Sequence, residues 1–314
     1  MMVGGIGMGL GIDAGGTQTR WALASSLGET ITSGQVAGLT ALQVATESGR
    51  EHIRRAIAAI AGDLTGPHRP DNVCAGITGY TDGDDVLRRL IAATLGLSPS
   101  AVAVRSDIEI AYLDLFRPGQ GYVIYAGTGT IAAYIDEQGA FHRAGGRGAI
   151  IDDAGGGFWI AIEALRHIWR SEDAEPGSWP KSPMAVKMFA SLGGSDWALT
   201  RQFVYQRDRG EIGELALAVA ATADNDPAAR DILQRAGIEL ARLCTLMVSR
   251  FGPKPMVLAG RVAQLHPILE QSLRAALPPS IDLQVRCSEA HIAAARIAAK
   301  SALTNKDIAR STPT

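Results

Sequence analysis

Cysteine is scarce in this chain: 314 residues include three, Cys74, Cys244 and Cys287. So few thiols, odd in number and far apart, exclude the disulfide framework of a small secreted domain and are typical of a reducing compartment. An excess of charge of one sign is also absent, since 30 basic and 32 acidic residues leave a formal net charge of −2. This balance lacks the basic footprint of a nucleic-acid-binding protein. We therefore expect a cytoplasmic protein without a nucleic-acid partner.

Long apolar runs are lacking as well. Stretches such as residues 214–223 are too short for a membrane span, so we expect no membrane partner. Residues 1–9 have neither the basic region nor the continuous apolar region of a signal peptide. The remaining composition, with 46% apolar and 20% charged residues, predicts globular domains with a sizeable core.

The predicted elements repeat along the chain. Residues 10–36 predict three strands joined by tight turns, followed by helices over 43–62 and 83–95 and strands over 72–78 and 101–107. Residues 121–145 restart the pattern with strand, Gly/Thr turn, strand, turn and strand. Helices dominate from 158 to 250. The rest of the chain predicts strands over 255–260 and 281–287, which alternate with helices over 262–277 and from 290. The repeat predicts two α/β halves that face each other across a cleft. We place the first domain at 1–116, completed by the helix 290–303, the second with its helical insertion at 117–289, and a frayed polar tail at 304–314.

Each half opens with a glycine-rich turn that could hold a phosphate. The P-loop pattern is absent, and the dinucleotide fingerprint occurs only loosely, at Gly9-Gly11-Ala14 and Gly127-Gly129-Ala132. That fingerprint requires a helix directly after the loop, whereas "TRWALA" and "TIAAYI" predict strands. The remaining design is a phosphate held in the turn of a β-hairpin, where glycines turn backbone N–H groups toward the anion.

Side chains at these turns suit the same chemistry. Thr17, Thr19, Thr128 and Thr130 can add hydroxyl donors. Asp13, at the end of the first strand, suits a Mg²⁺ ion held through water. Two ordinary hairpins remain the alternative, although two such turns at equivalent points favour phosphate binding.

Asp107 is the candidate catalytic base. Ser106 and Glu109 have the spacing of a capping box, so Ser106 can cap the helix and leave Asp107 free in the first turn. The helix dipole is expected to lower the pKa of Asp107, which would then orient a hydroxyl and accept its proton late. The alternative is an acidic residue that only stabilises the helix start.

Five motifs in order resemble the N-acetylglucosamine kinase and BadF/BadG/BcrA/BcrD ATPase family. They are "GIDAGGTQTR" (11–20), "AGITGY" (75–80), "YAGTGT" (125–130), "AGGRGAIIDDAGGGFWIAIEAL" (144–165) and "PMVLAGRV" (255–262). The resemblance covers essentially the whole chain. It implies an α/β fold of two ribonuclease H-like (actin-like ATPase) domains with a nucleotide and sugar cleft between them, in a family that commonly forms homodimers.

The resemblance also implies roles for individual residues in passing a phosphoryl group from ATP to a hydroxyl of an amino sugar. Asp13 would hold Mg²⁺, Asp107 would be the catalytic aspartate, and the adenosine motif would contribute Gly260 and Arg261. The sugar would lie at Asp107, Gly146, Arg147 and Asp153. The phosphates would contact Gly15, Gly16, Thr17, Gln18 and Thr19 in the first turn, and Gly127, Thr128, Gly129 and Thr130 in the second.

The chain departs from the family pattern near the sugar. Residues 38–43, which include Leu42, lack the usual asparagine, and Arg147 replaces a tryptophan. Asp152 replaces a glycine, Ala154 a glutamate and Gly156 a serine, and Arg261 replaces a second glycine of the adenosine motif. Arg147 could pair with an acidic group of a substrate or point to solvent. Asp153 could hold sugar hydroxyls or serve the helix start.

Three functions follow from these patterns. The first is an ATP-dependent kinase of an amino sugar such as N-acetylglucosamine or glucosamine, favoured by Asp13 and Asp107. The second is a sugar-responsive binding protein without turnover. The third is an ATPase that activates a partner enzyme, for which the family uses cysteines that hold an iron–sulfur cluster; Cys74 and Cys244 are instead expected in the core.

Overall fold

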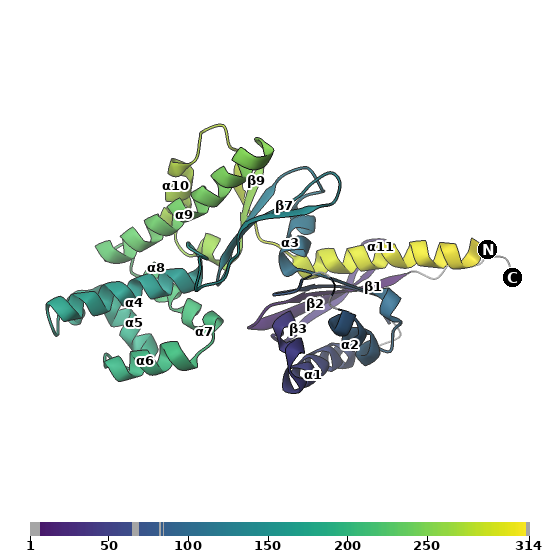
Figure 1. The fold of residues 1–314 in the computed structure, drawn as a ribbon, viewed down its shortest axis with the longest axis horizontal. Helices are drawn as coiled ribbons and strands as arrows, with labels where there is room; N and C mark the ends of the chain where they lie inside the picture. The colour runs from purple at the N-terminus through teal and green to yellow at the C-terminus, as the bar shows by residue number, and fades with distance from the viewer. Residues whose placement is uncertain (1–6, 65–68, 82, 84, 312–314) are drawn as a thin grey trace. The chain divides into compact units, whose positions relative to one another are not determined.

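The computed structural model describes residues 7–64, 69–81, 83 and 85–311, with the backbone alone for 302–311 (Figure 1). It divides into two compact units. The first contains the residues up to Leu115 together with those from Ser288 onward, and the second contains Phe116–Cys287. Each unit is built on a five-stranded sheet.

The first unit has the strand order β3-β2-β1-β4-β5. Strands β1 to β3 form an antiparallel meander, and β4 and β5 continue the sheet parallel to β1. The strands are β1 (Met8–Ala14), β2 (Gln18–Ser25), β3 (Thr30–Ala37), β4 (Asn72–Ile77) and β5 (Val102–Arg105). The helices are α1 (Glu47–Asp63), α2 (Asp85–Leu95), α3 (Asp107–Leu115) and α11 (Ala290–Ser311), with short 3₁₀ helices at Ala41–Ala45 and Pro99–Ala101.

Helices cover both faces of this sheet. Helices α1 and α2 pack large aliphatic side chains against one face, whereas α11 lies along the other (Figure 1). The packing under α11 is close because β1 presents glycines to it. A Cβ atom on Gly9 would lie 2.0 Å from the backbone nitrogen of Ala299, and one on Gly11 would lie 2.1 Å from that of Ala295. The last helix of the chain therefore seats directly on the first strand.

The second unit repeats the sheet of the first. Its order, β10-β9-β6-β7-β8, again combines an antiparallel meander (β6 to β8) with two strands parallel to its first member. The strands are β6 (Tyr122–Ala126), β7 (Thr130–Ile135), β8 (Phe141–Gly145), β9 (Met256–Ala259) and β10 (Leu283–Val285). This common topology confirms the internal repeat predicted from the sequence.

Helices make up most of the chain between β8 and β9. They are α4 (Gly157–Ala174), α5 (Pro183–Leu192), α6 (Trp197–Gln206), α7 (Arg209–Glu214), α8 (Ala216–Ala220) and α9 (Pro227–Phe251), with a 3₁₀ turn at Trp179–Lys181. Helix α9 packs on the sheet, and α10 (Pro267–Ala276) packs on α9. Within the described ranges, we find no helix of the length and apolar character that a bilayer crossing requires.

Some predicted boundaries differ from the structure for local reasons. The single helix expected over 262–277 is two segments, a 3₁₀ turn at Arg261–Gln264 and α10, because His266 caps a new helix that starts at Pro267. The helix expected from residue 43 begins at Glu47, since Thr46 accepts a hydrogen bond from the Gly49 N–H. The backbone of α11 is helical as far as Ser311, beyond residue 303.

Candidate active site

The first glycine-rich segment is the turn between β1 and β2. The Gly15 N–H donates to the Gln18 carbonyl at 3.0 Å and closes the turn. Gly16, Thr17 and Gln18 are exposed at its tip, so their backbone N–H groups and the Thr17 hydroxyl are accessible. Thr19 is fully buried in β2. The Thr19 hydroxyl is therefore not exposed at the tip of the turn, unlike that of Thr17.

Asp13 and Arg20 form an ion pair beside this turn. They are directly opposite each other in the β1–β2 register, and the Arg20 Nη2 lies 2.7 Å from the Asp13 Oδ2. The Asp13 side chain keeps 17% of its surface exposed and that of Arg20 keeps 39%. The pair is thus close enough to solvent for a ligand to reach it.

Asp107 begins α3 in the same unit. The predicted capping box is present, because the Glu109 N–H donates to the Ser106 Oγ at 3.3 Å while the Ser106 N–H donates to the Glu109 Oε2 at 3.0 Å. Asp107 is therefore not used as the helix cap, as the spacing predicted. A Cβ on Gly76 would lie 3.3 Å from the Asp107 Cα, so this glycine lets the start of α3 approach the sheet.

Gly76 also connects the two aspartates. It is the parallel neighbour of Asp13 in the β1–β4 register, so Asp13 on one side and Asp107 on the other flank the same residue of β4. Thr78 continues this strand end, and its N–H donates to the Ala14 carbonyl at 2.9 Å. The ends of β1 and β4 thus bring the two carboxylates to one edge of the sheet.

Two donors hold the Asp107 carboxylate. The Thr78 hydroxyl donates to Oδ2 at 2.5 Å, and the Ile108 N–H donates to Oδ1 at 2.9 Å. Burial nevertheless raises the pKa of Asp107 above its ordinary value, and the negative charge of Asp13 raises it further. The expectation that the helix dipole lowers this pKa is wrong, because loss of solvent around the carboxylate outweighs the favourable hydrogen bonds.

The donor set at this edge fits Mg²⁺. That ion keeps several waters and is usually held by one or two carboxylates together with substrate phosphates. Asp13 supplies a partly exposed carboxylate, and Asp107 supplies a second negative charge nearby. Because no third acidic or histidine ligand joins them in the described part of the chain, the remaining positions would belong to water and phosphate oxygens.

The second glycine-rich segment is the turn between β6 and β7. The Gly127 N–H donates to the Gly129 carbonyl at 2.9 Å. The first residues of α4 fasten the turn from behind, since the Gly157 and Phe158 N–H groups donate to the Gly127 and Thr128 carbonyls at 2.9 and 3.0 Å. These three hydrogen bonds fix the turn without using the N–H groups of Thr128 and Gly129.

Thr130 takes part in the same anchoring. It is buried, and its hydroxyl donates to the Ala154 carbonyl at 3.0 Å. Thr19, which holds the equivalent position of the first repeat, is also buried, but its hydroxyl has no hydrogen-bond partner among the described residues. The hydroxyls that remain partly or fully exposed at the two turns are those of Thr17 and Thr128.

Asp153 lies against the second turn. A Cβ on Gly129 would lie 2.3 Å from the Asp153 Oδ2, so the carboxylate fills the place of a side chain there. Asp153 is 4% exposed, and it accepts hydrogen bonds from the Gly148 N–H at 3.2 Å and from Arg209 at 2.8 Å. Arg209 was not predicted from the sequence, because it follows Asp153 by 56 residues and belongs to no recognisable motif.

The other predicted residues occupy loop positions of the second unit. Gly146 has a φ of 62°, and its N–H donates to the Thr130 carbonyl at 2.8 Å, whereas the neighbouring Arg147 is exposed. Gly260 follows β9 with a φ of 98°, and a Cβ there would lie 2.3 Å from the Ala126 carbonyl oxygen. The Gly260 backbone thus lies beside the end of β6, next to the second turn, with Arg261 exposed after it.

The structure therefore makes two groupings of the predicted residues. The first unit brings together Asp13, the turn 15–18 and Asp107. The second unit brings together the turn 127–130, Asp153 and Gly260. Arg147 is exposed whereas Asp153 is buried. The residues that depart from the family pattern are spread over both units, with Leu42 75% exposed beside Gly79.

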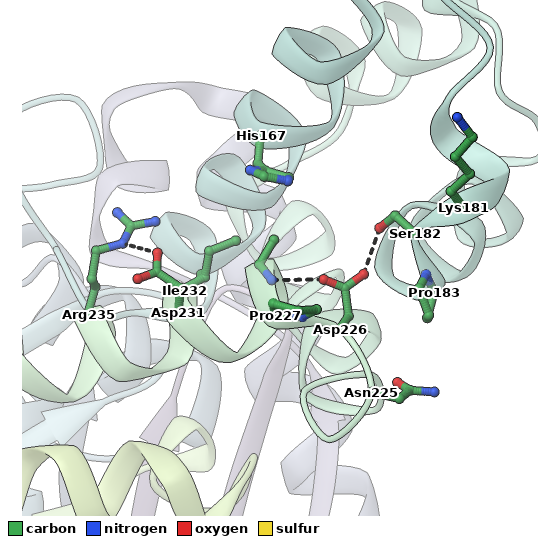
Figure 2. A pocket seen from close by; sticks show the side chains of 11 residues that line it. His167, Lys181, Ser182, Pro183, Asn225, Asp226, Pro227, Asp231, Ile232 and Arg235 are labelled. Carbon is green, nitrogen blue, oxygen red and sulfur yellow. Dashed lines mark hydrogen bonds and ion pairs between the residues drawn. The ribbon is translucent and has the colours of Figure 1, made fainter. Parts of the chain in front are cut away.

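A cavity of about 530 Å³ lies elsewhere in the second unit. Its lining includes His167, Asp226 and Arg235 and none of the predicted site residues (Figure 2). Asp226 is buried there and accepts from the Ser182 hydroxyl and from N–H groups at the starts of α5 and α9. This carboxylate therefore caps two helices, and we assign the cavity to the junction between them.

Two of the three thiols belong to the core. Cys74 and Cys244 are buried, and burial raises the pKa of Cys74 to about 11 and that of Cys244 to about 12. Cys287 is exposed. The prediction that Cys74 and Cys244 serve core packing is confirmed.

Comparisons with known proteins show which family and which relatives the chain resembles. A sequence model of the BadF/BadG/BcrA/BcrD ATPase family matches residues 10–281. An N-acetyl-D-glucosamine kinase of Dictyostelium discoideum is 27% identical over 176 residues, and an N-acetylmuramic acid/N-acetylglucosamine kinase of Clostridium acetobutylicum is 26% identical over 171. Each match covers 52% of this chain and 54% of the relative, so the chain spans about half the length of the curated relatives it matches.

Solved structures show the same fold. A protein of Porphyromonas gingivalis described as an N-acetylglucosamine kinase superposes with a TM-score of 0.70 and 17% identity, covering 95% of this chain and 99% of that one. A ROK family glucokinase of Streptomyces griseus superposes with a TM-score of 0.63 and 18% identity, covering 94% and 98%. These likenesses confirm the predicted fold class of two ribonuclease H-like domains.

Proposed function

The chain belongs to the BadF/BadG/BcrA/BcrD ATPase family, and from this premise we propose that it is an ATP-dependent kinase that phosphorylates a hydroxyl of an amino sugar. One observation carries the proposal: Asp13 and Asp107 flank Gly76, and Thr78 holds the Asp107 carboxylate. The names of the two partial relatives, kinases of N-acetylglucosamine and N-acetylmuramic acid, support the acceptor class.

Asp107 is the base in this proposal. The acceptor hydroxyl oxygen attacks the γ-phosphorus of ATP, the bond from that phosphorus to the bridging oxygen breaks, ADP leaves, and the hydroxyl proton passes to the Asp107 carboxylate. Positioning and charge stabilisation supply most of the catalysis in phosphoryl transfer. The Thr78 and Ile108 hydrogen bonds fix the carboxylate, and its raised pKa improves it as a proton acceptor.

The two glycine-rich turns are the proposed phosphate contacts. Gly16, Thr17 and Gln18 would offer backbone N–H groups and the Thr17 hydroxyl in the first turn, and Thr128 and Gly129 would do so in the second. Gly15 and Gly127 contribute by closing the two turns with their own N–H groups. Gly260 is the proposed adenosine contact. Asp13 would hold Mg²⁺, which when bound neutralises charge on the phosphates. The unpaired thiols suit a cytoplasmic enzyme.

An assay that couples ADP release to NADH oxidation tests the proposal. Mg·ATP is offered with glucosamine, N-acetylglucosamine, N-acetylmuramic acid or glucose in parallel. We expect one amino sugar to stimulate ADP release well above the rate without sugar. ADP release at the same rate with and without every sugar would contradict the kinase and support the partner-activating ATPase. Binding of sugar and nucleotide without ADP release would support the binding protein.

A further inference from the structure

We infer that Arg209, at the start of α7, contacts the phosphates of ATP at the second turn and supplies its positive charge. This inference rests on the proposed function, because it requires ATP phosphates at residues 127–130. It adds a residue that neither the motifs nor the family resemblance assigns.

The position of the guanidinium group is the first argument. Its Nη2 lies 2.8 Å from the Asp153 Oδ2, and a Cβ on Gly129 would lie 3.3 Å from the same nitrogen. The Asp153–Arg209 pair therefore stands against the Gly129 backbone, where any other residue would place a side chain. Glycine at 129 opens the turn to a charged pair that comes from elsewhere in the unit.

The difference in exposure within the pair is the second argument. The Asp153 side chain is 6% exposed and that of Arg209 is 51% exposed. Asp153 is also held by the Gly148 N–H, and its φ of 61° is a left-handed conformation that a residue other than glycine keeps only where its surroundings impose it. A buried, fixed carboxylate thus holds one nitrogen of Arg209, while the other donors of the guanidinium group remain accessible.

The support of α7 is the third argument. A capping box between Asp208 and Glu211 fixes its first turn. A Cβ on Gly213 would lie 3.3 Å from the Phe158 nitrogen and 3.5 Å from the Thr128 Cγ2, so the helix packs on the second turn and on the residues of α4 that anchor it. Arg209 is therefore presented by an element whose position depends on the turn itself.

The second turn itself has no positive charge to offer a phosphate. Residues 127–130, "GTGT", contain no cationic side chain. The phosphoryl group in transfer carries negative charge on its peripheral oxygens, and a fixed cation beside them lowers the barrier. The planar fork of arginine suits phosphate oxygens, and Asp153 orients that fork without enclosing it.

A purely structural role is the competing explanation, in which Arg209 only neutralises the buried Asp153. The double variant Asp153→Asn/Arg209→Gln separates the two, since it removes both charges, with asparagine of the same shape as aspartate and a shorter, neutral polar side chain in place of arginine. Arg207→Gln is the matched control, because Arg207 lies two residues earlier and pairs with Glu211 on the surface.

We expect Arg209→Gln to lower both the melting temperature and kcat/KM for ATP, the latter by about 100- to 1,000-fold, as for other removed transition-state donors. The double variant is expected to recover the melting temperature but not kcat/KM, and Arg207→Gln to keep both. Recovery of wild-type kcat/KM in the double variant would overturn the inference, because the charge of Arg209 would then matter only to Asp153.

Nucleotide binding distinguishes failure of this inference from failure of the proposed function. ATP should raise the melting temperature of Arg209→Gln less than that of the wild type, whereas adenosine, which lacks phosphates, should act equally on both. If ATP stabilises Arg209→Gln less than the wild type but the wild type phosphorylates no sugar, the kinase function is contradicted and the phosphate contact is supported. An equal ATP effect on both proteins would overturn the contact alone, and a wild type that ATP does not stabilise at all would overturn both.

Discussion

Replacing Asp107 by asparagine should abolish transfer while leaving the fold intact or more stable. The amide has nearly the same shape as the carboxylate, and both hydrogen bonds have a counterpart. Its oxygen can still accept from the Ile108 N–H, and its NH₂ group can donate to the Thr78 oxygen, which now acts as acceptor. The substitution therefore removes the negative charge and the proton-accepting site with little change in geometry.

The size of the rate loss can be estimated because Asp107→Asn removes only the negative charge and the proton-accepting site. Because the turns and Asp13 are untouched, ATP binding and positioning should persist, and the loss should be that of a general base alone. Such a base contributes about 100- to 10,000-fold, or about 2.7–5.5 kcal/mol of activation free energy. Asp107→Glu should lose less than Asp107→Asn, since it keeps a carboxylate with displaced geometry.

Although Asp107→Asn should lower the rate, it should leave the protein as stable as the wild type or more stable. Burial raises the pKa of Asp107 in the folded state, so the folded protein binds this proton more tightly than the unfolded chain. The stabilising contribution is complete below the ordinary pKa of an aspartate and is lost as the pH rises through the raised value. At pH 8 the wild type carries the cost of an ionised buried carboxylate and the asparagine variant does not, so the variant should melt at an equal or higher temperature.

Two assays check this prediction together. Coupled ADP release in the presence of the best sugar measures the rate, and differential scanning calorimetry at pH 5 and pH 8 measures stability, with ATP-induced stabilisation as the control for nucleotide binding. The rate of the wild type should also fall as the pH decreases through the raised pKa of Asp107. An asparagine variant that keeps more than about a tenth of the wild-type rate would refute the base assignment, because the expected loss is at least about 100-fold.

Three further perturbations follow from the same geometry. Asp13→Asn should raise the Mg²⁺ concentration needed for half-maximal rate, measured by titration with Mg²⁺, and an unchanged titration would contradict its role as the metal-binding carboxylate. Gly11→Ala should destabilise the protein by at least about 1–3 kcal/mol in chemical unfolding, since its Cβ would collide with the backbone of α11, and an unchanged unfolding midpoint would contradict the close packing of that helix. Iodoacetamide followed by mass spectrometry should label the exposed Cys287 quickly, while the buried Cys74 and Cys244, with pKa values of about 11 and 12, react slowly; equal labelling would contradict their burial.

Features that depend on neighbouring residues were predictable from the sequence. The Ser106–Glu109 capping box, the two glycine-rich hairpins and the repeated order of strands all follow from local spacing and periodicity, and the structure contains each of them. They are local because hydrogen bonds within a turn or a helix start involve residues a few positions apart.

Features that depend on tertiary packing were not predictable in this way. The raised pKa of Asp107 arises from burial and from the charge of Asp13, which lies 94 positions earlier in the chain, and the local dipole argument pointed in the wrong direction. Thr19 is buried because it lies on the face of β2 that carries Trp21 and Leu23, and helices α1 and α2 from later in the chain cover that face. Arg209 meets Asp153 only through the packing of α7 on the second turn.

The destination of the γ-phosphoryl group tests the central claim most directly. The protein is incubated with Mg·[γ-³²P]ATP and the most stimulating amino sugar, and the products are separated by anion-exchange chromatography. The kinase predicts that the label leaves ATP as a sugar phosphate, in amounts equal to the ADP formed, and that Asp107→Asn forms almost none. Label recovered as inorganic phosphate, at the same rate with or without the sugar, would contradict the account.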